Sequence, residues 1–263
     1  MEPFVKPPRF CQACRVSTHR STSEETTCGP ITIVHADEQI IIIDKPAAML
    51  THPHPRDPAA PTVVDLLRRR YPGVANVHRL DRMTTGAMVL ARTPEAAREL
   101  SRQFRDREVG KRYLAIVRGH TQDEGSITVP LEQPANGEEV AARTDYRTIA
   151  GGRVAEPIGR YEEGWFSLVE LTLHTGRTHQ ARRHLHRINH PVLGDTKHGD
   201  KNYNRWATAK TGEKHLYLRA TELSFRHPRD GEPVMVRLGL PENWMRLLET
   251  VGISEVSSTL QGP

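Results

Sequence analysis

The segment HRLDRMTTG, residues 78–86, places one carboxylate, Asp81, between two arginines, Arg79 and Arg82. Capping a turn is the commonest role of an aspartate that precedes threonine and glycine. A carboxylate held by guanidinium groups has a second possible role, because it stays ionised and can act as a nucleophile. The residues alone leave both interpretations open, and the second predicts a reactive carboxylate in a turn that precedes a strand.

Other common reaction centres are missing from the sequence. It has no phosphate loop ending in Lys-Ser/Thr, no GxGxxG and no GxSxG, so neither a nucleotide cofactor nor a serine hydrolase is indicated. A glycoside hydrolase would need a second carboxylate beside Asp81, and none stands out. His186 and His190 have the spacing of a helical metal pair, but the arginines around them repel a cation. We expect neither a metal nor a cofactor.

Positive charge is concentrated in one part of the chain. The 263 residues carry a net charge of +5, and the stretch from Arg177 to Arg229 alone holds twelve Lys and Arg against four Asp and Glu. Such a patch is typical of proteins that bind a polyanion through its phosphates. A solvated basic face is the alternative interpretation.

The hydrophobic patterns predict more strands than helices. We expect strands over residues 31–34, 39–44, 87–92, 111–119, 166–173, 215–218, 222–225 and 234–238, and helices over 62–71, 94–107, 178–188 and 241–249. Strands and helices do not alternate regularly. The sequence therefore predicts an α+β fold with a mixed, largely antiparallel central β-sheet flanked by helices.

The ends of the chain differ in composition from the rest. Residues 1–29 are rich in Pro, Ser, Thr and Glu, and we expect a flexible extension there, one globular domain over residues 30–255 and a flexible tail over 256–263. Cys11, Cys14, His19 and Cys28 are residue types that bind zinc, but a lone CxxC is a weak signal. With no apolar run near the ~20 residues of a membrane span, no secretory signal and three cysteines, we expect a cytoplasmic monomer that does not contact a membrane.

Four sequence blocks resemble the RluA family of pseudouridine synthases. They are DKPAAMLTHP (44–53), HRLDRMTTGAMVLA (78–91), KRYLAIVRG (111–119) and HTGRTHQARRHLHRINHPVLGDTKHG (174–199). Their order and spacing make the match specific, and it extends from about Ile31 to Leu248. The resemblance implies the pseudouridine synthase fold and an isomerase that detaches, rotates and rejoins uracil without a cofactor. The chain departs from the family pattern at Ala48 (glycine), Thr85 (serine) and Ala181 (a bulky aliphatic residue).

The resemblance also implies roles for four residues. Asp81 matches the essential aspartate, whose carboxylate reacts either at the anomeric carbon or through sugar deprotonation. Arg182 matches the arginine that pairs with this carboxylate. Tyr113 matches the tyrosine that packs on the flipped uracil and is implicated in removing the proton from carbon five. Arg79 matches the arginine that enters the helix where the target base has left the stack, which offsets the cost of unstacking.

RNA is therefore the expected partner. We assign RNA contacts to cationic and imidazole side chains of these blocks, namely Arg79, Arg82, Arg177, His179, Arg183, Lys197 and His198. The segment KHGDKNYNRW, residues 197–206, is expected to form a basic loop with aromatic side chains for backbone and stacking contacts. A non-catalytic RNA-binding protein would keep the basic stretch but would not need Asp81, Tyr113 and Arg182 together.

The target RNA is indicated by the third quarter of the chain. The residues RRHL (182–185) and HPVLGDTKHGD (190–200) look most like the branch of the family that modifies a T-stem uridine of tRNA, next to the acceptor stem. A uridine of large-subunit ribosomal RNA is the alternative. The expected function is thus a tRNA pseudouridine synthase.

Overall fold

The computed structural model describes residues 27–53, 57–133 and 136–253. The helices are α1 (Val63–Arg68), α2 (Pro94–Arg105), α3 (Gln180–Arg187), α4 (Lys201–Thr211) and α5 (Glu242–Thr250). The strands are β1 (Thr27–Cys28), β2 (Ile31–Ala36), β3 (Ile40–Lys45), β4 (Ala75–Asn76), β5 (Thr85–Ala91), β6 (Gly110–Arg118), β7 (Glu124–Ile127), β8 (Leu131–Glu132), β9 (Glu139–Val140), β10 (Thr144–Val154), β11 (Gly164–Leu173), β12 (Leu218–Arg226) and β13 (Pro233–Arg237).

One large sheet organises these elements. Its order is β1-β2-β3-β5-β12-β6-β11-β10-β7, with β4 added to β5 and β13 to β12, while β8 and β9 form a separate pair. The strands β5 and β12 run parallel, and the other pairs among the described residues are antiparallel. The predicted α+β fold with a mixed, largely antiparallel sheet is confirmed.

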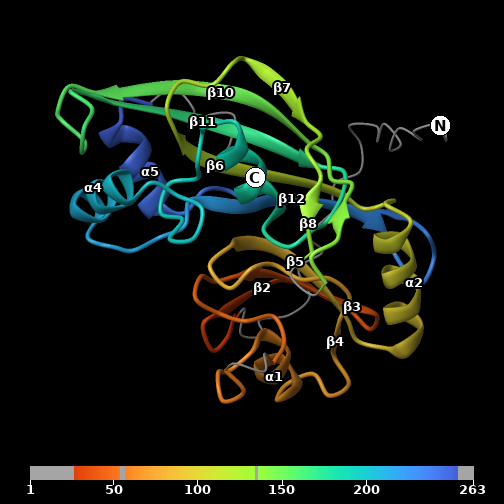
Figure 1. Ribbon diagram of the computed structural model, residues 1–263. Coiled ribbons are helices and arrows are strands. Elements are labelled where there is room, and N and C mark those ends of the chain that lie inside the picture. Colours follow the sequence, from red (N-terminus) through yellow and green to blue (C-terminus); the bar gives the residue numbers. More distant parts are fainter. Residues whose placement is uncertain (1–26, 54–56, 134–135, 254–263) are drawn as a thin grey trace.

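The strand β3 is buried on both faces, which explains its unbroken run of isoleucines. Ile41 and Ile43 pack in a cluster with α1, whereas Ile40 and Ile42 pack in a cluster with α2 on the other face. All four side chains are fully buried. Figure 1 shows α1 and α2 on either side of this half of the sheet. A strand covered on both faces loses the alternation of apolar and polar residues.

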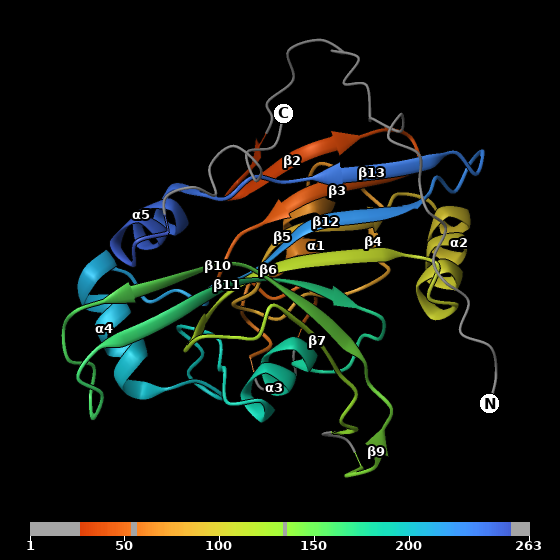
Figure 2. The same cartoon turned by 90° about the horizontal axis from the view of Figure 1, so that it is seen from above.

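The other half of the sheet has the same layered construction. The helix α3 packs on β6 and β11 through Ala181 and Leu185. The helices α4 and α5 pack on the opposite face of these strands, where Trp244 is fully buried. Figure 2 shows α4 and α5 together at one end of the sheet and α2 at the other end.

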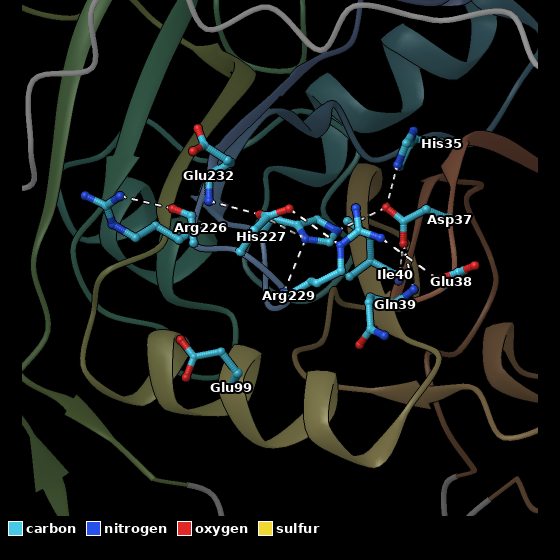
Figure 3. Close-up of polar contacts among 12 residues, drawn as sticks. His35, Asp37, Glu38, Gln39, Ile40, Glu99, Arg226, His227, Arg229 and Glu232 are labelled. Atoms are coloured by element: carbon cyan, nitrogen blue, oxygen red, sulfur yellow. Dashed lines mark hydrogen bonds and ion pairs between the residues drawn. The ribbon is translucent and has the colours of Figure 1, made fainter.

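A polar cluster ties two distant turns together. Asp37, in the turn between β2 and β3, accepts hydrogen bonds from the backbone of Gln39 and Ile40 at 2.7 and 2.9 Å. Its second oxygen lies 2.9 Å from the ring of His35 and 3.1 Å from that of His227, which follows β12 (Figure 3). Burial by itself would raise the pKa of Asp37, but these hydrogen bonds hold it far below its ordinary value.

The predicted loop over residues 197–206 is wrong. Asp200 caps α4 by accepting hydrogen bonds from the backbone of Asn202 and Tyr203, and the helix then begins at Lys201. Tyr203 is only 3% exposed, and Trp206 packs on Phe166 with 5.0 Å between ring centroids. These aromatic side chains pack in the core or against it, so they do not offer the stacking surface expected for RNA.

The predicted ends of the globular domain lie near the limits of the described residues. Cys11, Cys14 and His19 are outside them, as is the tail over 256–263, whereas Thr27 and Cys28 of the predicted extension form β1 and pair with β2. No set of three or more potential metal ligands is grouped within the described ranges. No helix in these ranges is long and apolar enough to cross a bilayer.

Candidate active site

A buried lysine stabilises the turn that carries Asp81. Lys45 is 0% exposed, and its ammonium donates hydrogen bonds to the carbonyls of Pro46, Arg82 and Thr84 at 2.9, 3.1 and 3.0 Å. Burial lowers the pKa of Lys45 to about 8, and the negative charge of Asp81 opposes that shift. Lys45 therefore fixes the backbone on the C-terminal side of Asp81.

Close approach of two strands fixes the other end of this turn. Gly86 has a φ of +112°, and a Cβ added there would lie 2.1 Å from the carbonyl oxygen of Ala220 on β12. Only glycine accepts this conformation and this contact. The Thr-Thr-Gly sequence thus lets β5 start beside β12, directly after the Asp81 turn.

Asp81 faces an arginine that is itself anchored by a second carboxylate. Arg182 Nη1 donates to Asp81 Oδ2 at 3.0 Å. Its Nε and Nη2 donate to the two oxygens of Asp195 at 2.6 and 2.8 Å. The Asp195 side chain is fully buried, while that of Asp81 is 21% exposed. Arg182 thus joins an inaccessible carboxylate to an accessible one.

The charges in this chain of ion pairs are strongly stabilised. Burial would raise the pKa of Asp195, but the hydrogen bonds from Arg182 and from the backbone of His198 and Lys197 bring it down to about 2. Burial likewise opposes the charge of Arg182, yet Asp195 and Asp81 raise the pKa of Arg182 above its ordinary value. The guanidinium is therefore permanently charged where it meets Asp81.

Asp81 opens into a cavity between the Asp81 turn, β6 and the start of α3. The lining includes Leu80, Thr84, Tyr113, Leu173 and Leu218, together with Gly176 to Arg182. Among the residues that the structure describes, Asp81 is the single carboxylate in this lining. Burial, and then the charge of Asp81, raise the pKa of Tyr113, so its phenol keeps its proton at neutral pH. One ionised acid thus faces a mostly apolar space that has an aromatic wall.

His179 and His198 form an imidazole pair, of which His179 lies beside Asp81 in the cavity lining. His179 begins α3 in a left-handed conformation, with a φ of 53°, and its Nε2 lies 3.9 Å from Asp81 Oδ2. Its Nδ1 lies 3.0 Å from Nε2 of His198. Burial lowers the pKa of His198 to about 4 and also lowers the pKa of His179. The lowered pKa values favour the neutral form of both imidazoles, which share one hydrogen bond beside Asp81.

Comparison with known proteins identifies this arrangement. A family model described as RNA pseudouridylate synthase matches residues 39–187, which include Asp81, Tyr113 and Arg182. The chain belongs to the RNA pseudouridylate synthase family. It is 38% identical over 232 residues to tRNA pseudouridine synthase C of Salmonella typhimurium, covering 84% of this chain and 89% of that relative. It is 35% identical over 239 residues to the protein of that name from Haemophilus influenzae, covering 85% of this chain and 99% of that relative.

Solved structures of the family have the same fold. Human RNA Pseudouridylate Synthase Domain Containing 1 superposes with a TM-score of 0.65 at 26% identity, covering 83% of this chain and 87% of that one. The human Domain Containing 4 protein gives a TM-score of 0.64 at 25% identity, covering 84% of this chain and 92% of that one. The predicted pseudouridine synthase fold and enzyme class are therefore confirmed.

Most of the residues singled out in this family member meet at one place. Asp81, Tyr113 and Arg182 come from the Asp81 turn, β6 and α3, and they line one cavity together with Arg79, Arg177 and His179. Arg82 lies on the other side of Asp81 and pairs with Asp57 at 3.1 Å.

Two of the predicted RNA contacts lie elsewhere in the synthase. Arg183 donates to the carbonyl of Glu132 at 2.8 Å, on the arm formed by β8 and β9. Lys197 is exposed and lies outside the cavity lining. Both residues extend the basic surface beside the cavity, although neither reaches into it.

Two residues that position this synthase site were not singled out in the sequence. Lys45 and Asp195 both lie in the matched blocks, in DKP and LGD, but a buried role cannot be read from a single charged residue. The sequence does hold a signal for Asp195, which is a charged residue that follows the apolar residues of PVLGD. A charged residue in such a setting is buried only when it is paired, so the pattern indicates an ion pair. The partner, Arg182, is 13 residues away and becomes recognisable only in the fold.

Proposed function

We propose that this chain converts a uridine in the T stem of tRNA, next to the acceptor stem, into pseudouridine, with Asp81 as the reacting carboxylate. Membership of the family supplies the reaction class. Relatives at 38% and 35% identity that carry the name tRNA pseudouridine synthase C support tRNA as the substrate. The observation that carries the proposal for Asp81 is its position in the cavity, where it is the one carboxylate among the described residues of the lining and pairs with Arg182 at 3.0 Å.

The carboxylate of Asp81 starts the reaction by one of two routes. It attacks the anomeric carbon of the ribose, or it removes a proton from the sugar. Either route breaks the bond between that carbon and N1 of uracil, which leaves with the bonding electrons. Uracil then rotates, C5 forms the new bond to the anomeric carbon, and Asp81 is regenerated. N1 gains a proton and C5 loses one, so the overall change is an isomerisation.

Tyr113 is positioned to act after the glycosidic bond breaks. Its ring forms a wall of the cavity and packs on the uracil that has left the stack. The charge of Asp81 is one of the two causes that raise the pKa of Tyr113. A bond between Asp81 and the sugar would remove that negative charge and so lower the pKa of Tyr113. The phenol would then lose its proton more easily and could take up the proton from C5.

The cavity also keeps the detached base from escaping. Isomerisation wins over loss of uracil only when the free base stays beside the ribose. Leu80, Leu173 and Leu218 supply apolar walls, and Arg79, which is exposed at the cavity rim, enters the space that the base has vacated. Arg82, Arg177, Arg183, Lys197 and His198 hold the surrounding RNA.

We also propose that the enzyme acts as a monomer in the cytoplasm, with residues 30–255 as its catalytic domain. Large exposed apolar side chains are few among the described residues, namely Val34, Val129 and Trp165, and they form no patch that requires a second copy.

Mapping of pseudouridine by mass spectrometry tests the proposed substrate. Cells that lack the gene, the same cells complemented with the wild-type gene, and cells complemented with Asp57→Asn supply total RNA. Asp57 pairs with Arg82 at 3.1 Å in the outer hollow on the other side of Asp81. It is the matched control, because it is a carboxylate near Asp81 that does not line the cavity shared by Asp81, Tyr113 and Arg182. We expect the T-stem mark to vanish on deletion and to return with both genes. Loss of a ribosomal mark from cells with intact tRNA would overturn the tRNA proposal.

A further inference from the structure

A basic hollow adjoins the cavity of Asp81 on the side of Tyr113. Its walls come from the end of α2, the start of β6 and the segment after β11, and five cations line it: Arg79, Arg105, Arg107, Lys111 and Arg177. No carboxylate contributes to this lining among the residues that the structure describes. Arg79, Tyr113 and Arg177 line both spaces, so the basic hollow and the cavity meet at these side chains.

Lys111 is a partly buried cation of the basic hollow. It lies two residues before Tyr113 on β6, so the two side chains point to the same face of the sheet. Its ammonium has no hydrogen bond or ion pair with any described residue. Burial, and then the nearby Arg107, lower the pKa of Lys111 to about 8. A desolvated cation without a counter-ion destabilises a fold, so its retention beside a reaction cavity indicates an anion from outside the chain.

Arginines close to the basic hollow form ion pairs with acidic residues of the chain. Arg112 lies next to Lys111 and is paired with Glu170 and Glu222 at 3.5 and 3.4 Å. On α2, Arg98 pairs with Glu95 at 2.9 Å. Lys111 and Arg107 have no such partner in the described ranges. Arg105, a third cation of the basic hollow, lies 3.5 Å from Asp106, which is outside the lining. Lys111 and Arg107 are therefore the cations of this wall whose charge a bound anion would balance.

The backbone at Arg107 supports the same conclusion. Arg107 follows the end of α2 with a φ of +62°, a left-handed conformation that is strained in residues other than glycine. Local strain of this kind persists where the surrounding structure holds it, and it is concentrated at binding and catalytic sites.

We propose that the basic hollow binds the phosphodiester next to the target uridine, with Lys111 and Arg107 as its main contacts. A base that leaves the stack swings out on its own backbone, so its flanking phosphates must lie beside the cavity that takes the base. A phosphate there supplies the anion that the hollow lacks, and phosphate contacts set the register of a nucleic acid on a protein. The inference rests on the proposed action on RNA, and it adds a positioning site to it.

Two charge-removing variants of the full chain test this proposal. We compare Lys111→Met and Arg107→Met with the wild type in binding a tRNA T-arm hairpin. Arg98→Met is the matched control, because Arg98 lies on α2, whose end forms one wall of the basic hollow, but does not line the hollow. Each hollow variant should lower the affinity about 10-fold at ~0.1 M salt. The slope of log K against log salt should become shallower by about 0.7–0.9, the value for one phosphate contact. The control should change neither quantity.

The melting temperature separates binding from a structural role. Lys111→Met should raise the melting temperature of the free protein while it weakens RNA binding, because it removes a desolvated charge. A lower melting temperature together with unchanged RNA affinity would show a structural role and overturn the proposal. Wild-type affinity and salt slope in both hollow variants would overturn it as well.

Neutralising one phosphate of the RNA identifies the contact. A methylphosphonate on the contacted side of the target uridine should weaken wild-type binding about 10-fold and leave binding by Lys111→Met unchanged, as expected for two groups that interact. Equal losses in wild type and variant at both flanking phosphates would contradict the assignment. Turnover of the hairpin by the wild type is measured first and tests the tRNA proposal separately. If the hairpin is not a substrate, the same comparison on a ribosomal RNA hairpin tests whether the basic hollow binds the flanking phosphate.

Discussion

Arg182 grips Asp195 through two parallel hydrogen bonds, at 2.6 and 2.8 Å, and turns its remaining nitrogen toward the reaction cavity. That nitrogen donates to Asp81 at 3.0 Å. The forked guanidinium suits this arrangement because it can bind one carboxylate with two nitrogens and still offer the third, which an ammonium cannot do with the same geometry. Asp195 thus orients the pair at the cavity although it does not line the cavity itself.

Asp195→Asn should damage stability and turnover together. The amide leaves the buried guanidinium of Arg182 partly unpaired, which we expect to lower the free energy of unfolding by about 3 kcal/mol. A misplaced Arg182 should slow turnover about 100-fold. Urea unfolding and tritium release from C5-labelled uridine in RNA measure the two effects. Asp200→Asn is the control, since Asp200 pairs with Arg118 at 2.7 Å outside the cavity lining. It should lose stability and keep turnover, and wild-type turnover in Asp195→Asn would contradict the positioning role.

Ala48→Gly should stabilise the protein. Ala48 stands where the family has glycine, and its φ is 60°, in the left-handed region. Relief of this strain outweighs the extra flexibility of glycine in the unfolded chain, for a net gain of about 0.5–1 kcal/mol. Urea unfolding measures it, with Ala87→Gly in β5 as a control that should lose stability. A destabilised Ala48→Gly protein would show that the alanine methyl group makes contacts that compensate for the backbone strain.

Acid should unfold the protein through carboxylates that are paired in the fold. The pKa of Asp195 falls from 3.8 to about 2, and that of Asp37 falls further. The unfolded state therefore binds more protons, so the stabilisation is complete above about pH 4 and is lost as the pH falls toward 2. For Asp195 it amounts to about 2 kcal/mol. Unfolding followed from pH 6 to pH 2 should show this loss, and Asp37→Asn should make it smaller. An unchanged acid limb in Asp37→Asn would contradict the role of the cluster in Figure 3.

Features with a local cause were predictable from the sequence. Thr93-Pro94 predicts the start of α2, and the structure confirms it, because Thr93 caps the helix by accepting from the backbone of Ala96. The alternation in KRYLAIVRG predicts β6. The position of Arg182 at the edge of the apolar face of α3, next to Ala181 and Leu185, predicts a partly buried charge. The structure buries it further, with the side chain 9% exposed.

Features with a distant cause were not predictable. The strand β10 contains Gly151 and Gly152 in its interior, a composition that argues against a strand. Gly152 is needed because a Cβ there would lie 2.3 Å from the carbonyl oxygen of Val251, after α5. The basic segment at the start of α4 looked like an RNA-binding loop because its aromatic partner Phe166 is 40 residues earlier in the chain.

Asp81 is the central residue of the proposed reaction, and tritium release tests its role most directly. RNA labelled with tritium at C5 of uridine is incubated with the wild type, with Asp81→Asn and with Asp57→Asn, and RNA affinity is measured in parallel. We predict that Asp81→Asn binds RNA and releases no tritium, while Asp57→Asn releases it at the wild-type rate. Wild-type release by Asp81→Asn would contradict this role, because the reaction would then proceed without the carboxylate that faces Tyr113 and Arg182 in the cavity.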